Sequence, residues 1–309
     1  MLSYTLKRLL QVIPVLLGTT FLIFVMVFAL PGDPIAALGG GQHFVSESVQ
    51  AQLRERYHLD DPLPVQYANY LVGIAQGDLG ADFNGREVSD IIARSWPTSV
   101  LLGGTAWLLQ VIVGIPLGVW AALNRGKWPD RVVAIITTLA FAIPVFVLAY
   151  TAQIQFGVEL GWFPVAGTSA GWPTAYILPA AVLSLMGLAA TARLTRSSLI
   201  ESLSSDYVRT ATAKGLSRQR VVVRHALRNS IIPVVTFLGI EFGALMGGAV
   251  IVEGIFNLPG LGNEVFKAIG AQNGPVVVGI STLLVLVFLF VNLLVDLLYA
   301  VLDPKVRHA

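Results

Sequence analysis

Long apolar runs alternate with short polar segments along almost the whole chain. Six of these runs are long enough to cross about 30 Å of hydrocarbon as helices. They are Leu9–Leu30, Ser99–Leu123, Val132–Phe156, Ala175–Leu194, Ile231–Val252 and Pro275–Leu302. Because no water satisfies backbone groups inside lipid, the pattern predicts an all-α membrane protein with six transmembrane helices.

The first apolar run follows Lys7 and Arg8, as the core of a signal peptide would. Its roughly 20 residues exceed the roughly 7–15 residues of such a core, and no pair of small residues marks a cleavage site after it. We therefore expect an uncleaved first span.

Composition and charge give the sidedness. Of 309 residues, 55% are hydrophobic and 12% are charged, against about 25% charged in soluble domains. Fifteen of the 20 Lys and Arg residues fall in the N-terminus, the 124–131 loop, the 193–228 loop and the C-terminal tail, which six spans place on one side. The positive-inside rule puts that side, with both termini, in the cytoplasm. Because cysteine is absent, disulfides, thiolate nucleophiles and Cys-ligated metals are excluded.

No repeat or linker divides the chain, so residues 1–309 are expected to form a single transmembrane domain. Residues 31–98 form a polar external cap segment. Within it, 46–58 and 65–76 have the periodicity of short amphipathic helices.

The most basic stretch begins at Asp206 and ends at Pro233. Ser204, Ser205 and Asp206 offer N-capping oxygens for a short helix over 207–214. Gly215 then supplies the left-handed residue that ends a helix, and Ser217 can cap a second helix that runs toward Pro233. The pattern predicts a helical elbow at the cytoplasmic surface.

Side-chain spacing assigns faces to the two helices of the elbow. Tyr207, Ala211 and Lys214 share one face of the first helix, which we expect to be exposed. Arg220, Arg224 and Arg228 recur every fourth residue and form a charged stripe on the second.

The elbow admits three interpretations. Its A-x-x-x-G-x-S core resembles the turn of a DNA-reading helix-turn-helix. Membrane spans tether the stretch at both ends, which rules out docking on a duplex, and no nucleic-acid partner is expected. A basic loop resting on anionic lipid is the second interpretation. The predicted cap and glycine turn favour the third, a lever that fits a cytoplasmic partner.

Motifs for chemistry are weak. The GTSAG sequence of 167–171 matches the G-x-S-x-G pattern of serine hydrolases, but none of the histidines falls in a span to act as its base. No phosphate-binding loop and no metal-binding motif occur. We therefore expect no catalytic site, no metal and no cofactor in this chain.

Glu241 lies in the middle third of the fifth span, where a carboxylate is costly and is a functional candidate. The alternative is a packing contact with Gln110 or Gln153; these three residues form the candidate substrate path. On the same span, Gly239, Gly243 and Gly247 form a stripe that lets another helix approach closely. Asn292 and Asp296 share a face of the last span, and we expect them to be structural or solvated rather than substrate-binding.

Many stretches together resemble one family, the dipeptide/oligopeptide transport permeases among ABC importer permeases. They are LKRLLQVIPVLLG (6–18), LPGDP (30–34), DPLPVQYANYL (61–71), GDLG (77–80), VGIPLGVWAALNRG (113–126), ARLTRSSLIE (192–201), GGAVIVEGIFNLPGLG (247–262) and VNLLVDLLYAVLDPKVR (291–307). In the elbow, the residues that match the family's motif are Ala211, Gly215, His225, Leu227 and Pro233. Two positions depart from the family: Thr212 stands where a basic residue is frequent, and Glu241 where a neutral polar residue is expected.

The resemblance implies a type I ABC importer permease fold in the plasma membrane of a bacterium or archaeon. It implies import of di- or oligopeptides, driven by one or two kinds of partner ATPase subunit that bind ATP and Mg. An extracytoplasmic binding protein would deliver the cargo, and a second homologous permease would pair with the stripe of Gly239, Gly243 and Gly247. Residues 204–230 would be the coupling segment; its ATPase contacts would be Tyr207, Arg209, Thr210, Ala211, Ala213, Lys214, Gly215 and Leu216.

Two alternatives remain. The same machinery serves non-peptide cargo in related proteins, namely heme, glutathione or a nickel chelate. A proton-coupled secondary transporter using Glu241 is the other alternative, although such proteins usually carry internal repeats and several ionisable groups at the midplane.

Overall fold

The structure, a computed structural model, describes residues 2–28, 54, 61–83 and 85–302. Within these ranges the chain is helical, and its one β-bridge joins Ala81 and Glu87. In chain order the elements are α1 (Leu2–Phe28), α4 (Leu63–Ala75), α5 (Val88–Leu109), η1 (Gln110–Gly114), α6 (Ile115–Leu123), α7 (Trp128–Ala142), α8 (Val145–Ala152), η2 (Gln153–Glu159), α9 (Thr174–Leu203), α10 (Asp206–Ala213), α11 (Arg218–Arg220), η3 (Val221–Leu227), α12 (Arg228–Gly248), α13 (Val250–Ile255), α14 (Leu261–Gly270) and α15 (Gly274–Leu302), where η marks a π-helix.

Five helical runs in the described residues are long and apolar enough to span a membrane. They are Arg8–Phe28, Val88–Leu123, Thr174–Leu203, Arg218–Gly247 and Gly274–Leu297. The sixth predicted span, Val132–Phe156, is not one straight helix: α7 and the α8–η2 run meet at an angle of 102°. Pro144 lies at the break, where it cannot donate a backbone hydrogen bond to continue the helix. The all-α membrane fold is confirmed, with the third span broken.

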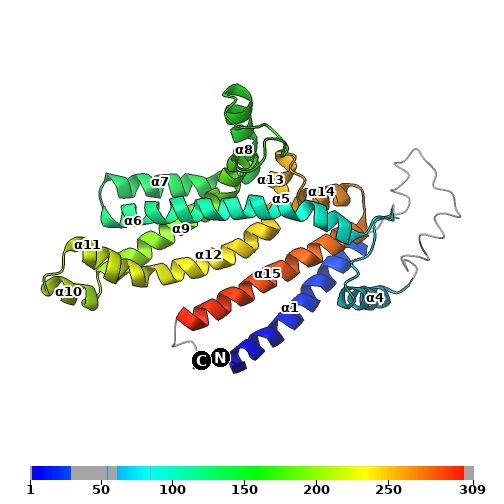
Figure 1. The fold of residues 1–309 in the computed structure, drawn as a ribbon, viewed down its shortest axis with the longest axis horizontal. Coiled ribbons are helices and arrows are strands. Elements are labelled where there is room, and N and C mark those ends of the chain that lie inside the picture. Colours follow the sequence, from blue (N-terminus) through cyan, green and yellow to red (C-terminus); the bar gives the residue numbers. More distant parts are fainter. Residues whose placement is uncertain (1, 29–53, 55–60, 84, 303–309) are drawn as a thin grey trace.

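Helix α9 lies at the centre of the bundle and packs against α5, α6, α7 and α12. On the other side of α12 comes α15, and α1 packs on α15 at the edge of the bundle (Figure 1). The start of α1, the end of α15, the α6–α7 turn and α10 lie toward the same end of the bundle (Figure 1). This arrangement agrees with the sidedness predicted from the charges.

The α6–α9 contact is close because glycines face it. A Cβ at Gly118 would lie 2.5 Å from the Ala192 carbonyl oxygen, and one at Gly114 would lie 3.0 Å from Thr191. Small residues at four-residue spacing allow two helices to approach in lipid at this distance. The region from 114 to 118 therefore fixes α6 on α9.

The opposite end of the bundle carries the hairpin of α13 and α14. Its centre is the carboxylate of Glu253, which is fully buried. This carboxylate accepts hydrogen bonds from the Ser99 hydroxyl at 2.6 Å and from the Asn263 backbone N–H at 3.0 Å. Because Asn263 lies in the first turn of α14, Glu253 caps that helix and fixes it to α5.

Part of the external cap segment is described. Helix α4 confirms the helix predicted over 65–76, and it contacts α1 through a hydrogen bond of 2.9 Å between Tyr67 Oη and Thr20 Oγ1. Tyr70 donates to Thr282 of α15 at 2.8 Å. The helix predicted over 46–58 lies outside the described residues apart from Arg54.

Candidate coupling segment and intramembrane site

The coupling segment has the predicted elbow. Helix α10 covers Asp206–Ala213, and Gly215 follows it with φ = +80°, the left-handed region that favours glycine. Ser205 is the N-cap residue, but its side chain caps no N–H of the helix and donates instead to the Ser202 carbonyl. Beyond Ser217 the chain continues through α11 and the π-helical η3 into α12 without a break.

A small apolar core fixes the elbow to the bundle. Its buried members come from α6, α9, α10 and η3; they are Ala122, Leu199, Val208, Ala211, Val221 and Ala226. Ala211 is only 7% exposed and Leu216 packs against the same core. The prediction that Ala211 shares an exposed face with Tyr207 and Lys214 is wrong, because Ala211 lies one turn beyond Val208 and faces inward with it.

The outer face of α10 is polar and exposed, with Arg209, Thr210, Ala213 and Lys214 on it. Tyr207 is 42% exposed, and its hydroxyl is hydrogen-bonded to Ser202 of α9. Ser202 in turn donates to the Ala226 carbonyl in η3 at 2.9 Å. Tyr207 and Ser202 thereby connect α9, α10 and η3 through hydrogen bonds.

Two arginines of α9 hold α7, a relationship that sequence reasoning missed. Arg196 forms an ion pair with Asp130, and Arg196 Nη2 lies 2.9 Å from Asp130 Oδ2. Asp130 is only 6% exposed. The same carboxylate accepts the Gly126 N–H at 2.9 Å. Arg193 donates to Thr137 and to Thr138 at 2.9 and 2.7 Å. A lone Asp in a basic loop was the available signal for this contact.

The intramembrane site joins three helical runs. Glu241 of α12 accepts a long hydrogen bond of 3.4 Å from Gln110 Nε2, and Gln110 is fully buried at the start of η1. The third member is Gly187 of α9, where an added Cβ would lie 2.5 Å from Glu241 Oε1. Gln110 Oε1 has no hydrogen-bond partner among the described residues. The site therefore places a half-buried carboxyl beside a fixed amide, with one unpaired acceptor.

Gln153 lies apart from this pair. Its Nε2 donates to the Val165 carbonyl at 2.8 Å and to the Ile255 carbonyl at 3.0 Å. These contacts connect the start of η2 with the following loop and with α13. Of the three residues predicted for the substrate path, the structure brings together Gln110 and Glu241 only.

The three glycines of the stripe on α12 differ in their surroundings: Gly239 and Gly243 lie against α15, and Gly247 does not. A Cβ at Gly239 would overlap Val295 of α15, and one at Gly243 would lie 3.2 Å from Phe288 of the same helix. The helix that approaches these two glycines therefore belongs to this chain, which corrects the expectation of a second permease there. At Gly247 a Cβ would meet none of the described residues within 4 Å, so a partner contact stays a prediction at that position alone.

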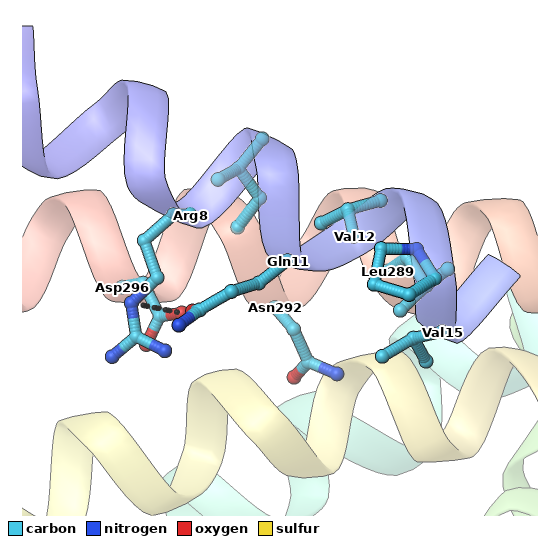
Figure 2. Close-up of a pocket in the computed structure, with 9 residues that line it drawn as sticks. Arg8, Gln11, Val12, Val15, Leu289, Asn292 and Asp296 are labelled. Atoms are coloured by element: carbon cyan, nitrogen blue, oxygen red, sulfur yellow. Dashed lines mark ion pairs between the residues drawn. The ribbon is translucent and has the colours of Figure 1, made fainter.

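A groove separates α1 and α15 near the ends of both helices that we predict to be cytoplasmic. Figure 2 shows Arg8 and Gln11 of α1 beside Asn292 and Asp296 of α15, and the Arg8 guanidinium lies 3.4 Å from the Asp296 carboxylate. This ion pair between the first and last spans fits the structural role predicted for Asp296.

Comparison with known proteins covers nearly the whole chain. Residues 114–308 match the family model described as binding-protein-dependent transport system inner membrane component, and residues 1–103 match the model of the N-terminal part of such components. The chain is also 40% identical to proteins called glutathione transport system permease protein GsiC. Those from Escherichia coli (strain K12), Salmonella typhimurium (strain LT2) and Salmonella typhi align over 309 residues, which is 100% of this chain and 100% of each relative.

Proposed function

The chain belongs to the family of inner membrane components of binding-protein-dependent transport systems, and from that premise we propose that it imports short peptides, with glutathione as the first candidate. The chain is a multi-pass permease subunit of an ABC importer, a transport protein and not an enzyme. The observation that carries the cargo proposal is the end-to-end similarity to glutathione permeases. Glutathione is itself a tripeptide with a free amino group, so it agrees with the resemblance to peptide permeases.

Glu241 is the candidate cargo contact. A carboxylate within a span can pair with the ammonium group that every unmodified peptide carries. Gln110 holds this carboxyl from one side, and Gly187 leaves both side chains room. Family membership favours ATP-driven import over proton coupling, which leaves Glu241 free for this role.

Energy would come from partners. In this proposal ATPase subunits dock on the exposed face of α10, and closure of their dimer moves the elbow between inward- and outward-facing states. A second permease completes the pathway, and an external binding protein docks on residues 31–98. The connection from Tyr207 through Ser202 to Ala226 supports this role, because it joins the docking face to two spans.

The cargo is tested by uptake of radiolabelled glutathione into cells that lack their own glutathione and dipeptide importers and express the complete transporter. We expect uptake that competes with unlabelled glutathione and short peptides and not with heme or a nickel chelate. Uptake that only heme or nickel chelate suppresses would refute the peptide proposal and leave family membership intact.

ATPase docking is tested by crosslinking, because the chain has no cysteine of its own. Ala213→Cys places a single thiol on the exposed face of α10, and Asn124→Cys places one in the α6–α7 turn as a control. A short bifunctional reagent should join the first variant, and not the second, to an ATPase subunit. Crosslinking at Asn124 alone would contradict docking at α10.

A further inference from the structure

A second pocket opens where the coupling segment meets α12, at the end of the bundle that we predict to be cytoplasmic. Its volume is about 680 Å³. The residues that line it are Tyr207, Arg224, His225, Arg228, Asn229, Ile231, Ile232 and Val235. We call it the basic pocket. Neither the candidate cargo contacts nor the outer face of α10 contributes to it, apart from Tyr207.

One part of the basic pocket is cationic, and no aspartate or glutamate of the described residues lines it. Arg224 and Arg228 are exposed, and neither forms an ion pair within the part of the chain that the structure describes. By contrast, Arg196 and Arg209 of the same cytoplasmic region each have an aspartate partner. Two guanidinium groups without a carboxylate in one concave site indicate an anionic ligand.

The part of the basic pocket that follows Asn229 along α12 is apolar. Ile231, Ile232 and Val235 follow the arginines along α12, toward the middle of the span. At 1.5 Å per residue, Arg224 and Val235 are on the order of 15 Å apart along the helix. The pocket therefore changes from charged to apolar along the helix, on the length scale of a headgroup and the first part of an acyl chain.

We propose that the basic pocket binds an anionic phospholipid of the cytoplasmic leaflet, with its phosphate on Arg224 and Arg228 and an acyl chain along Ile231, Ile232 and Val235. Basic pockets between helices on the cytoplasmic side suit such headgroups, and guanidinium forks match phosphate oxygens. The apolar wall selects a lipid over a freely diffusing anion, because inorganic phosphate gains nothing from it.

The position of the site gives the lipid an effect on coupling. Tyr207 forms one wall of the basic pocket and also belongs to α10, while the other lining residues belong to η3 and α12. A lipid held there would brace the coupling segment against the span that carries Glu241. This inference is independent of the cargo, because lipid retention is measured without transport.

The test compares Arg224→Gln/Arg228→Gln with Arg218→Gln/Arg220→Gln in the full-length chain purified with its co-expressed partners. The second pair removes the same charge from the same exposed stretch outside the basic pocket. Phosphatidylglycerol and phosphatidylcholine are added to delipidated complex, and retained lipid is counted by native mass spectrometry. Size-exclusion profiles establish that each variant is folded and assembled.

We expect wild type and the Arg218/Arg220 variant to retain phosphatidylglycerol over phosphatidylcholine. The Arg224/Arg228 variant should bind phosphatidylglycerol about tenfold or more weakly, since each basic residue near a membrane surface contributes roughly 1 kcal/mol. Equal retention by both variants, or equal loss in both, overturns the proposal. Displacement of the lipid by inorganic phosphate or by glutathione also overturns it, because the pocket would then serve a soluble anion.

Discussion

Ser99 and Glu253 are 154 positions apart in the chain, and the hydroxyl of the first donates to the carboxylate of the second at 2.6 Å in a buried site. Ser99 also accepts the Leu261 N–H at 2.8 Å. One serine thus connects the second span to the α13–α14 hairpin and orients the carboxylate that caps α14. This contact joins α5, α13 and α14 at the end of the bundle that we predict to be external.

Ser99→Ala should therefore lower the free energy of unfolding by about 1–3 kcal/mol, because it leaves a buried acceptor and a buried N–H unsatisfied. The matched control is Ser89→Ala: that hydroxyl bonds Glu87 at 3.0 Å on the exposed surface, so its loss should cost less than about 0.5 kcal/mol. Denaturant unfolding in detergent measures both. Similar losses in the two variants would show that burial of Ser99 carries no special stability.

Glu253 should make stability depend on pH. Burial raises the pKa of this carboxyl above its usual range, and the hydrogen bonds from Ser99 and Asn263 only partly oppose that rise. A group whose pKa is higher in the folded than in the unfolded state contributes its full stabilisation at pH values below the unfolded pKa. This contribution is lost as pH rises through the folded pKa. As pH falls from neutrality toward the usual titration range of a glutamate carboxyl, wild type should gain stability relative to Glu253→Gln. A stability difference that stays constant over this range would refute the assignment.

The ion pair of Asp130 and Arg196 should stabilise the α7–α9 contact. Asp130 is buried while the Arg196 side chain is 34% exposed. The loss of stability on removing one charge should therefore lie between the ~0–1 kcal/mol typical of exposed pairs and the ~3–5 kcal/mol typical of buried ones. We expect Arg196→Gln to cost about 2 kcal/mol in unfolding experiments, and Lys267→Gln, which breaks the more exposed pair with Glu264, to cost much less. If the Asp130→Asn/Arg196→Gln double variant is no more stable than Arg196→Gln alone, the cost does not come from an unpaired charge.

Apolar patterning predicted the helical membrane fold and located five of the spans, because the length and composition of a span are local properties. The elbow was also predictable, because a glycine directly after a short helix indicates a left-handed residue that ends the helix, and Gly215 has that conformation. The 102° break near Pro144 was not, because a proline requires a kink without fixing its angle. That angle depends on packing with the rest of the bundle.

Contacts between distant residues were the part that sequence could not give. The glycine stripe correctly indicated close helix packing, but spacing alone does not name the neighbour, which is α15 at Gly239 and Gly243. Nothing in the sequence around Gly187 showed that a glycine is needed there. The need arises because a Cβ would overlap the side chains of Gln110 and Glu241, which belong to two other spans. Ala211 was predicted on the exposed face because both faces of α10 contain small residues. The side of α10 that faces inward is set by its packing on the core around Leu199, which the sequence of the helix does not show.

Glu241→Gln tests the cargo contact. If the carboxylate pairs with a peptide's ammonium group, the change should raise KM for glutathione about tenfold or more, since a hydrogen bond to a charged group contributes about 1.5–3 kcal/mol. An N-acetylated peptide lacks that charge, so its uptake should be nearly the same in wild type and variant. Uptake assays in proteoliposomes with both cargos measure the difference. Equal effects on the two cargos would place Glu241 outside the recognition of the amino group.

Gly215→Ala tests the elbow as a lever. Gly215 has φ = +80°, and a Cβ there would meet no described residue within 4 Å, so the substitution adds backbone strain without a clash among them. Gly126 in the α6–α7 turn has φ = +78° and equally open surroundings, which makes Gly126→Ala a control with the same strain of about 1–2 kcal/mol. In proteoliposomes we expect Gly215→Ala to lower the amount of cargo moved per ATP hydrolysed, because relief of the strain shifts α10 relative to α9 and η3. Gly126→Ala should leave that ratio unchanged. If both variants move the wild-type amount of cargo per ATP, the elbow does not transmit the work of the ATPases. If that ratio falls equally in both, strain in any turn at this end of the bundle is enough to uncouple the transporter.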